Sequence, residues 1–167
     1  MLDMETLVEQ YGAAIYGLCR KLTGSRFDAD DLYQQTFLIA MGKRFYKDGN
    51  PKALLVSICI AQWKNDVRKH SRRQRIAPVV EAEPETVGAD IGMEAQMEKR
   101  EQLAQLRKIV SKLDDRCRLP VLLYYGMEMP IAEIAEVLHI PAGTVKSRLA
   151  SAREKIKREL EVTGYDG

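Results

Sequence analysis

The sequence is poor in the residues that build metal centres and disulfide frameworks. Its 167 residues include three cysteines, Cys19, Cys59 and Cys117, and two histidines, His70 and His139. The cysteines are far apart and no CxxC pair occurs, whereas zinc sites and disulfide frameworks need clustered partners. The sequence therefore predicts neither kind of site. Each cysteine is interpreted as a small buried hydrophobic residue in a reducing compartment.

Long apolar runs and catalytic motifs are also missing. The longest apolar stretch, residues 53–61, is interrupted by Ser57 and falls well short of the roughly 20 residues that a membrane span needs. The first ten residues, MLDMETLVEQ, are too acidic and polar for a signal peptide. No Gly-rich phosphate loop, clustered metal ligands or Ser/His/Asp arrangement can be recognised. We therefore expect a cytoplasmic protein that is not an enzyme, uses no cofactor and does not insert into membranes.

Charge is unevenly distributed along the chain, although the net charge is only +2. Residues 1–76 hold 13 Lys/Arg against 8 Asp/Glu, and residues 99–167 hold 13 against 10. Between these blocks, residues 77–98 hold six acidic side chains and no Lys or Arg. Two basic blocks separated by an acidic segment indicate two domains that face nucleic acid and a linker that does not.

Apolar residues recur at steps of three and four along most of the sequence, which predicts an all-α fold. Two small helical domains are expected, residues 1–76 and 94–167, joined by a flexible linker at 77–93 that contains two prolines and two glycines. The predicted helices span residues 3–23, 28–41, 52–75, 94–113, 118–125, 131–138 and 141–160. Asp28 is the expected N-cap of the second helix, whose apolar stripe should be Leu32, Tyr33, Phe37, Ala40 and Met41.

The segment PIAEIAEVLHIPAGTVKSRLASAREKI (residues 130–156) has the spacing of a helix-turn-helix. Ala135 supplies a small residue where two helices cross, and Val145 supplies an apolar residue that closes the pair. His139 falls at the turn, which needs a positive φ and usually carries glycine. Pro141 suits the first position of the second helix, where its missing N–H costs nothing.

The second helix of this motif presents polar and basic side chains. Residues near its start are candidates for base contacts in a major groove, and those further along for phosphate contacts. The alternative is a packing module whose basic face is merely solvated. The candidate DNA-binding residues are Thr144, Lys146, Ser147, Arg148, Ser151 and Arg153.

Basic residues crowd the end of the third predicted helix. Lys64, Arg68, Arg72 and Arg75 follow one another at four, four and three residues, so they share a face that could track a DNA backbone. An ordinary solvated basic face is the alternative. Trp63 stands at the head of this stripe, where it either stacks on an unpaired base or, as is commoner for a lone Trp, packs in the core.

The second predicted helix has the opposite character. Asp28, Asp30, Asp31, Gln34 and Gln35 lie away from much of its apolar stripe. Phosphates would repel such a face, so a protein partner fits it better than DNA does. The alternative is a capped helix whose polar side is simply solvated.

Together these segments resemble the extracytoplasmic-function sigma factors, small members of the sigma-70 superfamily. DADDLYQQTFLIAM (residues 28–41) is similar to the family's segment that binds the clamp helices of the largest RNA polymerase subunit. Residues 118–156, with IPAGTVKSRL as the most specific stretch, resemble the domain that reads the promoter −35 element. In the intervening PKALLVSICIAQWKNDVRK, Leu54, Ala61 and Asn65 stand where the family commonly has Trp, Asn and Asp.

The resemblance implies a role for each segment and a set of partners. Residues 1–76 would bind core polymerase and the −10 element, residues 94–167 would bind the −35 element, and an anti-sigma factor would hold the protein inactive. The core contacts would be Asp28, Asp31, Gln34, Gln35 and Phe37. The −10 contacts would come from the loop at 45–52 and the helix after it, through Lys52, Trp63, Lys64, Arg68 and Arg72.

The competing interpretation is a helix-turn-helix transcriptional regulator that acts without core polymerase. It would predict a ligand pocket or a dimerisation helix in residues 1–76. Dependence on polymerase distinguishes the two, because a regulator binds its specific DNA alone.

Overall fold

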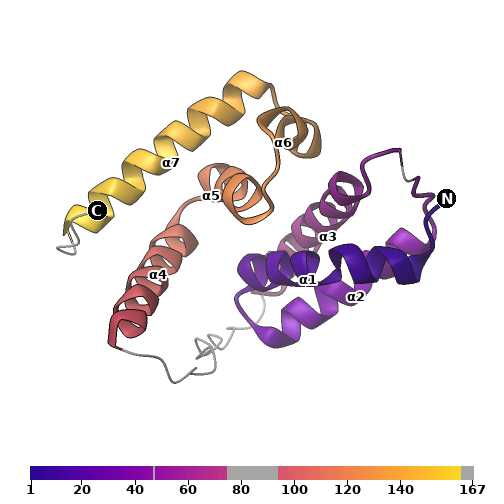
Figure 1. Cartoon of the computed structure of the whole chain (residues 1–167), viewed down its shortest axis with the longest axis horizontal. Coiled ribbons are helices and arrows are strands. Elements are labelled where there is room, and N and C mark those ends of the chain that lie inside the picture. Colours follow the sequence, from indigo (N-terminus) through magenta and orange to yellow (C-terminus); the bar gives the residue numbers. More distant parts are fainter. Residues whose placement is uncertain (47, 75–93, 163–167) are drawn as a thin grey trace. The chain divides into compact units, whose positions relative to one another are not determined.

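The computed structural model describes residues 1–46, 48–74 and 94–162. All regular elements of this part are helices, and they form two compact units that follow one another in the chain (Figure 1). The predicted all-α class with two small helical domains is confirmed. The linker predicted at 77–93 lies outside the described residues.

The first unit begins with α1 (Met4–Thr23), which has a defined stop at both ends. The side chain of Asp3 accepts the backbone N–H of Thr6 at 2.8 Å and caps the free donors of the first turn. At the other end, Gly24 has φ 75°, a left-handed conformation that glycine adopts without a Cβ clash. The helix predicted over residues 3–23 is thus confirmed.

Helix α2 (Arg26–Met41) begins two residues earlier than expected. Its N-cap is Ser25, whose hydroxyl accepts the N–H of Asp28 and donates to the Asp28 carboxylate at 2.9 Å. The prediction of Asp28 as N-cap is therefore wrong, because Ser25 caps the first turn and Asp28 is the third helical residue. Met41 was predicted to belong to the apolar stripe, but it is 65% exposed, so this part of the prediction is wrong.

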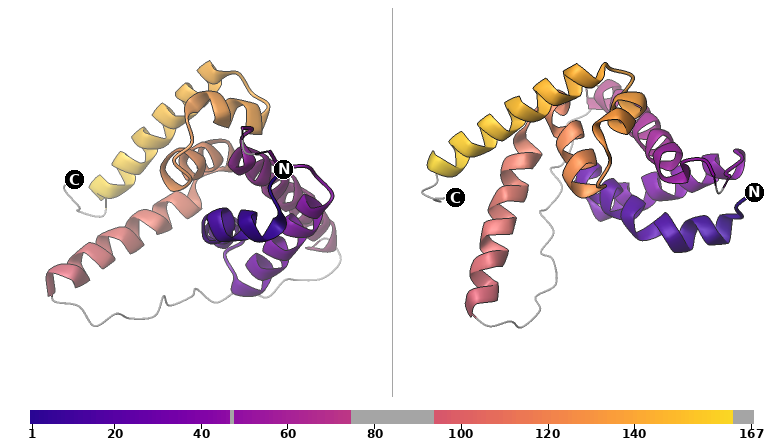
Figure 2. Two further views of the ribbon diagram at one scale, coloured as in Figure 1. Left: turned by 45° about the vertical axis from the view of Figure 1, so that its right-hand side comes forward. Right: turned by 45° about the horizontal axis from the view of Figure 1, so that its top comes forward.

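Helix α3 (Pro51–Gln74) completes the first unit, and each of its three helices contacts the other two (Figure 2). Cys19 of α1 and Cys59 of α3 are fully buried, with their sulfurs 3.6 Å apart. Cys117 is buried as well, so the predicted burial of the three cysteines is confirmed. The remaining side chains of the core interlock between the helices. They include Leu7, Ile15, Leu18, Leu22, Leu32, Phe37, Leu55, Val56, Ile58, Ile60 and Trp63.

The second unit contains α4 (Glu94–Lys112), α5 (Asp115–Val121), α6 (Ile131–Leu138) and α7 (Ala142–Val162). A five-residue π-helix, η1 (Leu122–Gly126), continues α5, so the single helix predicted over 118–125 is two segments of different geometry. Helix α4 was predicted correctly, but its Met97, Leu103 and Leu106 are at least 36% exposed and only Ile109 is fully buried. The core comes from Leu119, Val121, Leu123, Met129, Ile134, Val137, Val145 and Leu149.

A three-residue turn joins α6 to α7 and sets the angle of the helix-turn-helix. His139 has φ 56° and ψ 45°, the left-handed conformation expected for this position. Its backbone N–H donates to the carbonyl of Glu136 and that of Ile140 to the carbonyl of Ala135, which satisfies the last carbonyls of α6. Pro141 precedes α7 rather than opening it, because its carbonyl accepts the first helical hydrogen bonds.

Leu55 provides a test of the core of the first unit. Its side chain is fully buried, so Leu55→Ala should lower the free energy of unfolding by about 2–5 kcal/mol through lost burial and a residual cavity. Leu38→Ala makes the same chemical change at a site that is 65% exposed and should cost no more than about 0.5 kcal/mol. Chemical denaturation followed by circular dichroism measures both; equal losses would contradict this packing.

His139 provides a matching test for the second unit. We expect His139→Gly to leave the free energy of unfolding within about 1 kcal/mol of the unmodified protein, because relief of the left-handed backbone offsets the greater flexibility of glycine. His139→Val should lower it by about 1–3 kcal/mol, since a β-branched residue tolerates this conformation poorly. The same denaturation measurement applies. A valine variant as stable as the glycine variant would mean that the turn is not left-handed.

Candidate nucleic-acid interface

Helix α7 buries one stripe and presents the opposite one. Val145, Leu149 and Ala152 are at most 1% exposed and face the core of the second unit. At 3.6 residues per turn, the face opposite them is centred on Ser147 and Glu154, with Ser151 beside them, and all three are exposed. Short polar groups thus lie near the middle of the free face beside one carboxylate, in the part of a helix that comes closest to base edges in a major groove.

The four other predicted DNA-binding residues lie on the two flanks of this face. Thr144 and Arg148 are half-buried on one flank, whereas Lys146 and Arg153 are exposed on the other. All six predicted residues thus lie outside the buried stripe of α7, with the serines on its free face and cations on both flanks. A duplex meets its phosphates at the edges of a groove and its bases in the middle, so this order of side chains is suited to DNA.

Two cations of α7 have partners inside the second unit. The Arg153 guanidinium donates through Nε to the hydroxyl of Tyr125 at 2.7 Å. The Lys155 ammonium lies 3.8 Å from the carboxylate of Asp114, the N-cap of α5. The backbone N–H of Cys117, together with this ammonium, lowers the pKa of Asp114 below its ordinary value. Lys155 therefore joins α7 to α5 in addition to carrying charge.

Helix α3 presents a basic surface beyond its buried half. Lys64 and Arg68 are exposed and Lys52 is half-buried, whereas the side chain of Arg72 lies outside the described residues. Trp63 is only 6% exposed, so its indole packs in the core as the commoner interpretation held. In the described part of α3, the side chains accessible to a ligand are therefore mainly the charged ones.

The outer face of α2 combines acidic, amide and apolar side chains. Asp28, Asp31 and Gln34 are exposed and Gln35 is half-buried, whereas Phe37 is only 8% exposed and belongs to the core.

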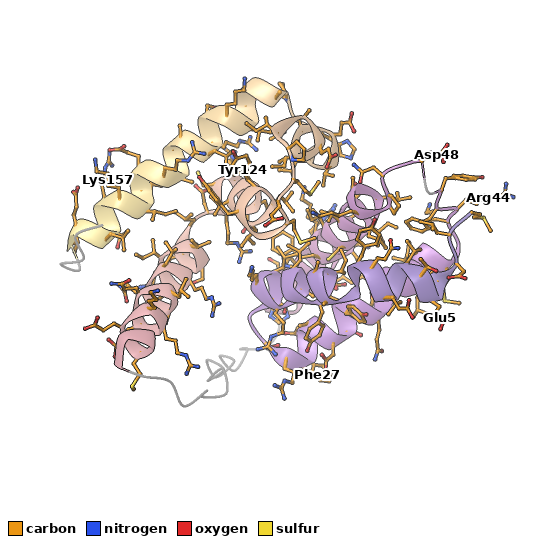
Figure 3. All side chains as sticks on the ribbon, in the orientation of Figure 1. Glu5, Phe27, Arg44, Asp48, Tyr124 and Lys157 are labelled. Carbon is orange, nitrogen blue, oxygen red and sulfur yellow. The ribbon has the colours of Figure 1, made fainter. Side chains whose placement is uncertain are left out.

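Sequence reasoning missed three apolar residues on this α2 face. Phe27, Leu38 and Met41 are 83%, 65% and 65% exposed, and Phe27 projects from the start of the helix (Figure 3). Their spacing held the signal, because positions 27, 31, 34, 38 and 41 follow steps of four and three and share one face. Large apolar groups beside carboxylates indicate a surface that packs against protein.

A chain of side-chain hydrogen bonds ties this acidic face to α3. Gln35 donates to Asp31 at 2.9 Å, and Gln62 of α3 donates both to Gln35 and, at 3.0 Å, to Asp66. Burial raises the pKa of Asp66 above its ordinary value, the bond from Gln62 opposes this shift, and the carboxylate of Asp31 adds to it. The chain holds the amide of Gln35 in one orientation and couples the two helices.

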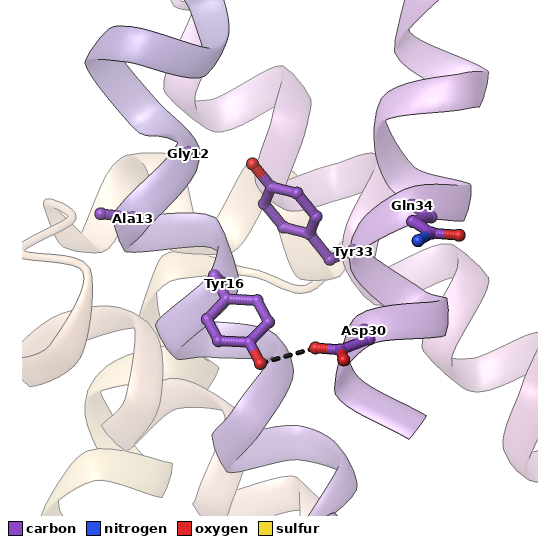
Figure 4. A pocket seen from close by; sticks show the side chains of 6 residues that line it. All are labelled: Gly12, Ala13, Tyr16, Asp30, Tyr33 and Gln34. Atoms are coloured by element: carbon purple, nitrogen blue, oxygen red, sulfur yellow. Dashed lines mark hydrogen bonds between the residues drawn. The ribbon is translucent and has the colours of Figure 1, made fainter. Parts of the chain in front are cut away.

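A pocket of about 400 Å³ opens between α1 and α2 beside this face (Figure 4). The hydroxyl of Tyr16 donates to Asp30 at 2.6 Å, and the ring of Tyr16 meets that of Tyr33 edge to face at 5.6 Å. Gly12 leaves room for the Tyr33 hydroxyl, which would lie 3.0 Å from any added Cβ. The lining residues are Gly12, Ala13, Tyr16, Asp30, Tyr33 and Gln34.

The part of the chain that the structure describes shows neither a cluster of metal ligands nor a membrane-spanning helix. Within it, no three His, Cys, Asp or Glu side chains gather in a way that could hold a metal ion. None of its helices is both long enough and apolar enough to cross a membrane.

Two family models match successive parts of the chain. Sigma-70 region 2 matches residues 7–73, which include α2 and nearly all of α3, and sigma-70 region 4 matches residues 103–156, which include the helix-turn-helix. The segments resembling core-binding and −35-binding regions in the sequence thus fall within the matched regions of the same family.

Curated relatives extend this similarity over most of the chain. The ECF RNA polymerase sigma factor SigW of Bacillus subtilis is 28% identical over 162 residues, which cover 92% of this chain and 87% of that protein. SigC of Mycobacterium tuberculosis, also an ECF sigma factor, is 30% identical over 143 residues, or 83% of this chain and 74% of SigC.

Solved structures share the fold. The sigma factor RpoE from Bartonella quintana, solved in complex with the anti-sigma factor NepR, superposes with a TM-score of 0.77 at 23% identity, covering 95% of this chain and 96% of that one. CnrH in complex with the cytosolic domain of CnrY gives a TM-score of 0.67 at 24% identity, covering 95% and 88%. Two matched regions in the right order, a 30% identical relative and the shared fold lead to one conclusion: the chain is an extracytoplasmic-function sigma factor of the sigma-70 family.

Proposed function

We propose that this sigma factor divides promoter recognition between its two units. The first binds core polymerase through α2 and the −10 element through α3, and the second binds the −35 element through α7. The observation that supports this division is the contrast between two free helix faces. The face of α2 carries carboxylates and exposed apolar groups, whereas the face of α7 carries cations around a polar centre.

The proposed polymerase contact is the outer face of α2, which would meet the clamp helices of the largest subunit. Asp28, Asp31, Gln34 and Gln35 supply polar contacts there. Phe37 belongs to the core and would act by holding α2 in place rather than by touching the partner. Burial of Phe27, Leu38 and Met41 against the partner would remove large apolar groups from water, which drives most protein association.

The proposed −10 contact combines α3 with the loop that precedes it. Lys64 and Arg68 would track the backbone, with Lys52 and Arg72 at the two ends of the helix. Trp63 is buried and would support this surface from the core rather than stack on a base. Tyr46, half-exposed in the loop, offers a ring on which an unpaired base could stack.

The proposed −35 contact uses the free face of α7 in the major groove. Ser147 and Ser151 lie where base edges would be read, and Thr144, Lys146, Arg148 and Arg153 flank them. Recognition of both elements is binding rather than catalysis, so we propose no enzymatic activity for this chain. Its site of action is then the cytoplasm, where polymerase and promoter meet.

An anti-sigma factor is the proposed regulator. RpoE and CnrH, which share this fold, were each solved with a protein partner, named as an anti-sigma factor for RpoE. By analogy, a partner that covers the α2 face or the α7 face would prevent binding of polymerase or promoter. The apolar groups left exposed on α2 offer such a partner the same contacts as polymerase.

The division of labour predicts opposite defects in two variants. Arg148→Ala should weaken binding of the holoenzyme to promoter DNA by about tenfold or more, through loss of a groove contact, and leave core affinity unchanged. Asp31→Ala combined with Gln35→Ala should weaken core binding by a similar factor. Fluorescence anisotropy of the labelled protein against core polymerase measures the second effect. Anisotropy of labelled promoter against a saturated holoenzyme measures the first.

Matched controls carry the same chemical changes on other faces. Arg107→Ala on α4 and the pair Glu9→Ala with Gln10→Ala on α1 remove exposed side chains of equal type and should leave both affinities unchanged. If Arg148→Ala and the α2 double variant lost core binding equally, the proposed separation of roles would be wrong.

A further inference from the structure

The guanidinium of Arg153 is held by a pair of tyrosines on a different element. Its Nε donates to the Tyr125 hydroxyl at 2.7 Å, and its central carbon lies 6.0 Å from the ring centre of Tyr124 and 5.8 Å from that of Tyr125. Tyr124 and Tyr125 meet edge to face with ring centres 4.9 Å apart. One cation thus interacts with two neighbouring rings and a hydroxyl, although 28 residues separate Arg153 from Tyr125.

Both tyrosines lie within the π-helix η1. Neighbours on an α-helix point about 100° apart, so both would rarely reach one partner. The wider turn over Leu122–Gly126 alters the angle between neighbouring side chains. The centres of both rings lie within 6.0 Å of the central guanidinium carbon of Arg153. Tyr124 lies half-buried beside α7 (Figure 3), whereas Tyr125 is 54% exposed.

Most of the hydrogen-bonding capacity of Arg153 stays available in this arrangement. A guanidinium has five N–H donors, and the bond to Tyr125 uses only the one at Nε. The four donors at the two terminal nitrogens remain, in the planar fork that matches the oxygens of a phosphate. An arginine held in this way loses less side-chain freedom on binding than a mobile one does.

Arg153 also belongs to a line of cations along one flank of α7. Lys146, Arg153 and Lys157 are all exposed, and their steps of seven and four residues keep them on the same side of the helix. They span about 16 Å at 1.5 Å per residue, enough to meet several phosphates of one strand. Arg153 alone among the three is fixed by hydrogen bonding and ring contacts.

We propose that Tyr125, supported by Tyr124, is a positioning residue that orients Arg153 toward a backbone phosphate of duplex DNA beside the −35 element. This inference rests on the proposed function of α7 and adds the element that prepares its phosphate contact. Arg153 then contributes affinity rather than sequence preference, in contrast to the serines at the centre of the face. A bond that serves only to hold α7 against η1 would give no such contribution.

The salt dependence of promoter binding separates these two roles. Holoenzyme is titrated onto labelled promoter duplex over a range of salt concentrations, with unmodified protein, Tyr125→Phe and Arg153→Ala. Loss of one phosphate contact in Arg153→Ala should reduce the slope of log K against log salt by about 0.9. Tyr125→Phe keeps the ring and the charge but removes the accepting hydroxyl, so binding should weaken about threefold to tenfold on all promoter sequences alike.

Tyr11→Phe on α1 is the matched control, because it removes one hydroxyl from a half-buried tyrosine of the other unit. It should leave the affinity unchanged. If Tyr125→Phe lowered the melting temperature but bound promoter with the affinity and slope of the unmodified protein, the positioning role would be overturned while the proposed function stood. Failure of the unmodified holoenzyme to bind promoter specifically would instead contradict the proposed function itself.

Discussion

The burial of a single stripe on each surface helix determines what this protein can bind. In α2, Ala29, Leu32, Thr36 and Ala40 are at most 1% exposed against α1 and α3, so the opposite face, with its carboxylates and apolar groups, must point outward. In α7, Val145, Leu149 and Ala152 do the same for a polar and basic face. Small helical units have little apolar surface to bury, and each stripe is therefore both the source of stability and the determinant of orientation.

Local chemistry made much of the fold predictable. Gly24 ends α1, the left-handed His139 ends α6, and steps of three and four residues located every long helix within a few positions. Helix boundaries were less predictable where two residues could cap the same helix. Ser25 and Asp28 both carry suitable side chains, and the N-cap of α2 is the earlier of the two, Ser25. The π-helix after α5 has no pattern of its own in the sequence, because it continues the apolar spacing of the helix before it.

The candidate site also has a part that could be predicted from local sequence and a part that could not. The exposure of single residues on one helix, such as Lys146, Ser147 and Ser151, could be predicted from spacing alone. Contacts between distant segments could not, since nothing in the sequence pairs Arg153 with Tyr125 or Gln62 with Gln35. The burial of several large apolar residues also differed from what their chemistry suggested: Phe37 and Trp63 belong to the core, whereas Phe27 and Leu38 are exposed. The periodicity of a helix shows which residues share a face but not which neighbours cover that face.

In-vitro transcription tests the central claim, that the two helix faces work together in directing polymerase to a promoter. Purified protein is added to bacterial core polymerase on a pooled genomic template, and transcript starts are mapped with and without each component. A sigma factor that works in this way gives new starts that share two spaced upstream elements and that require both core and this protein. Absence of new starts, together with specific DNA binding by the protein alone, would contradict this claim and indicate a regulator that acts without polymerase.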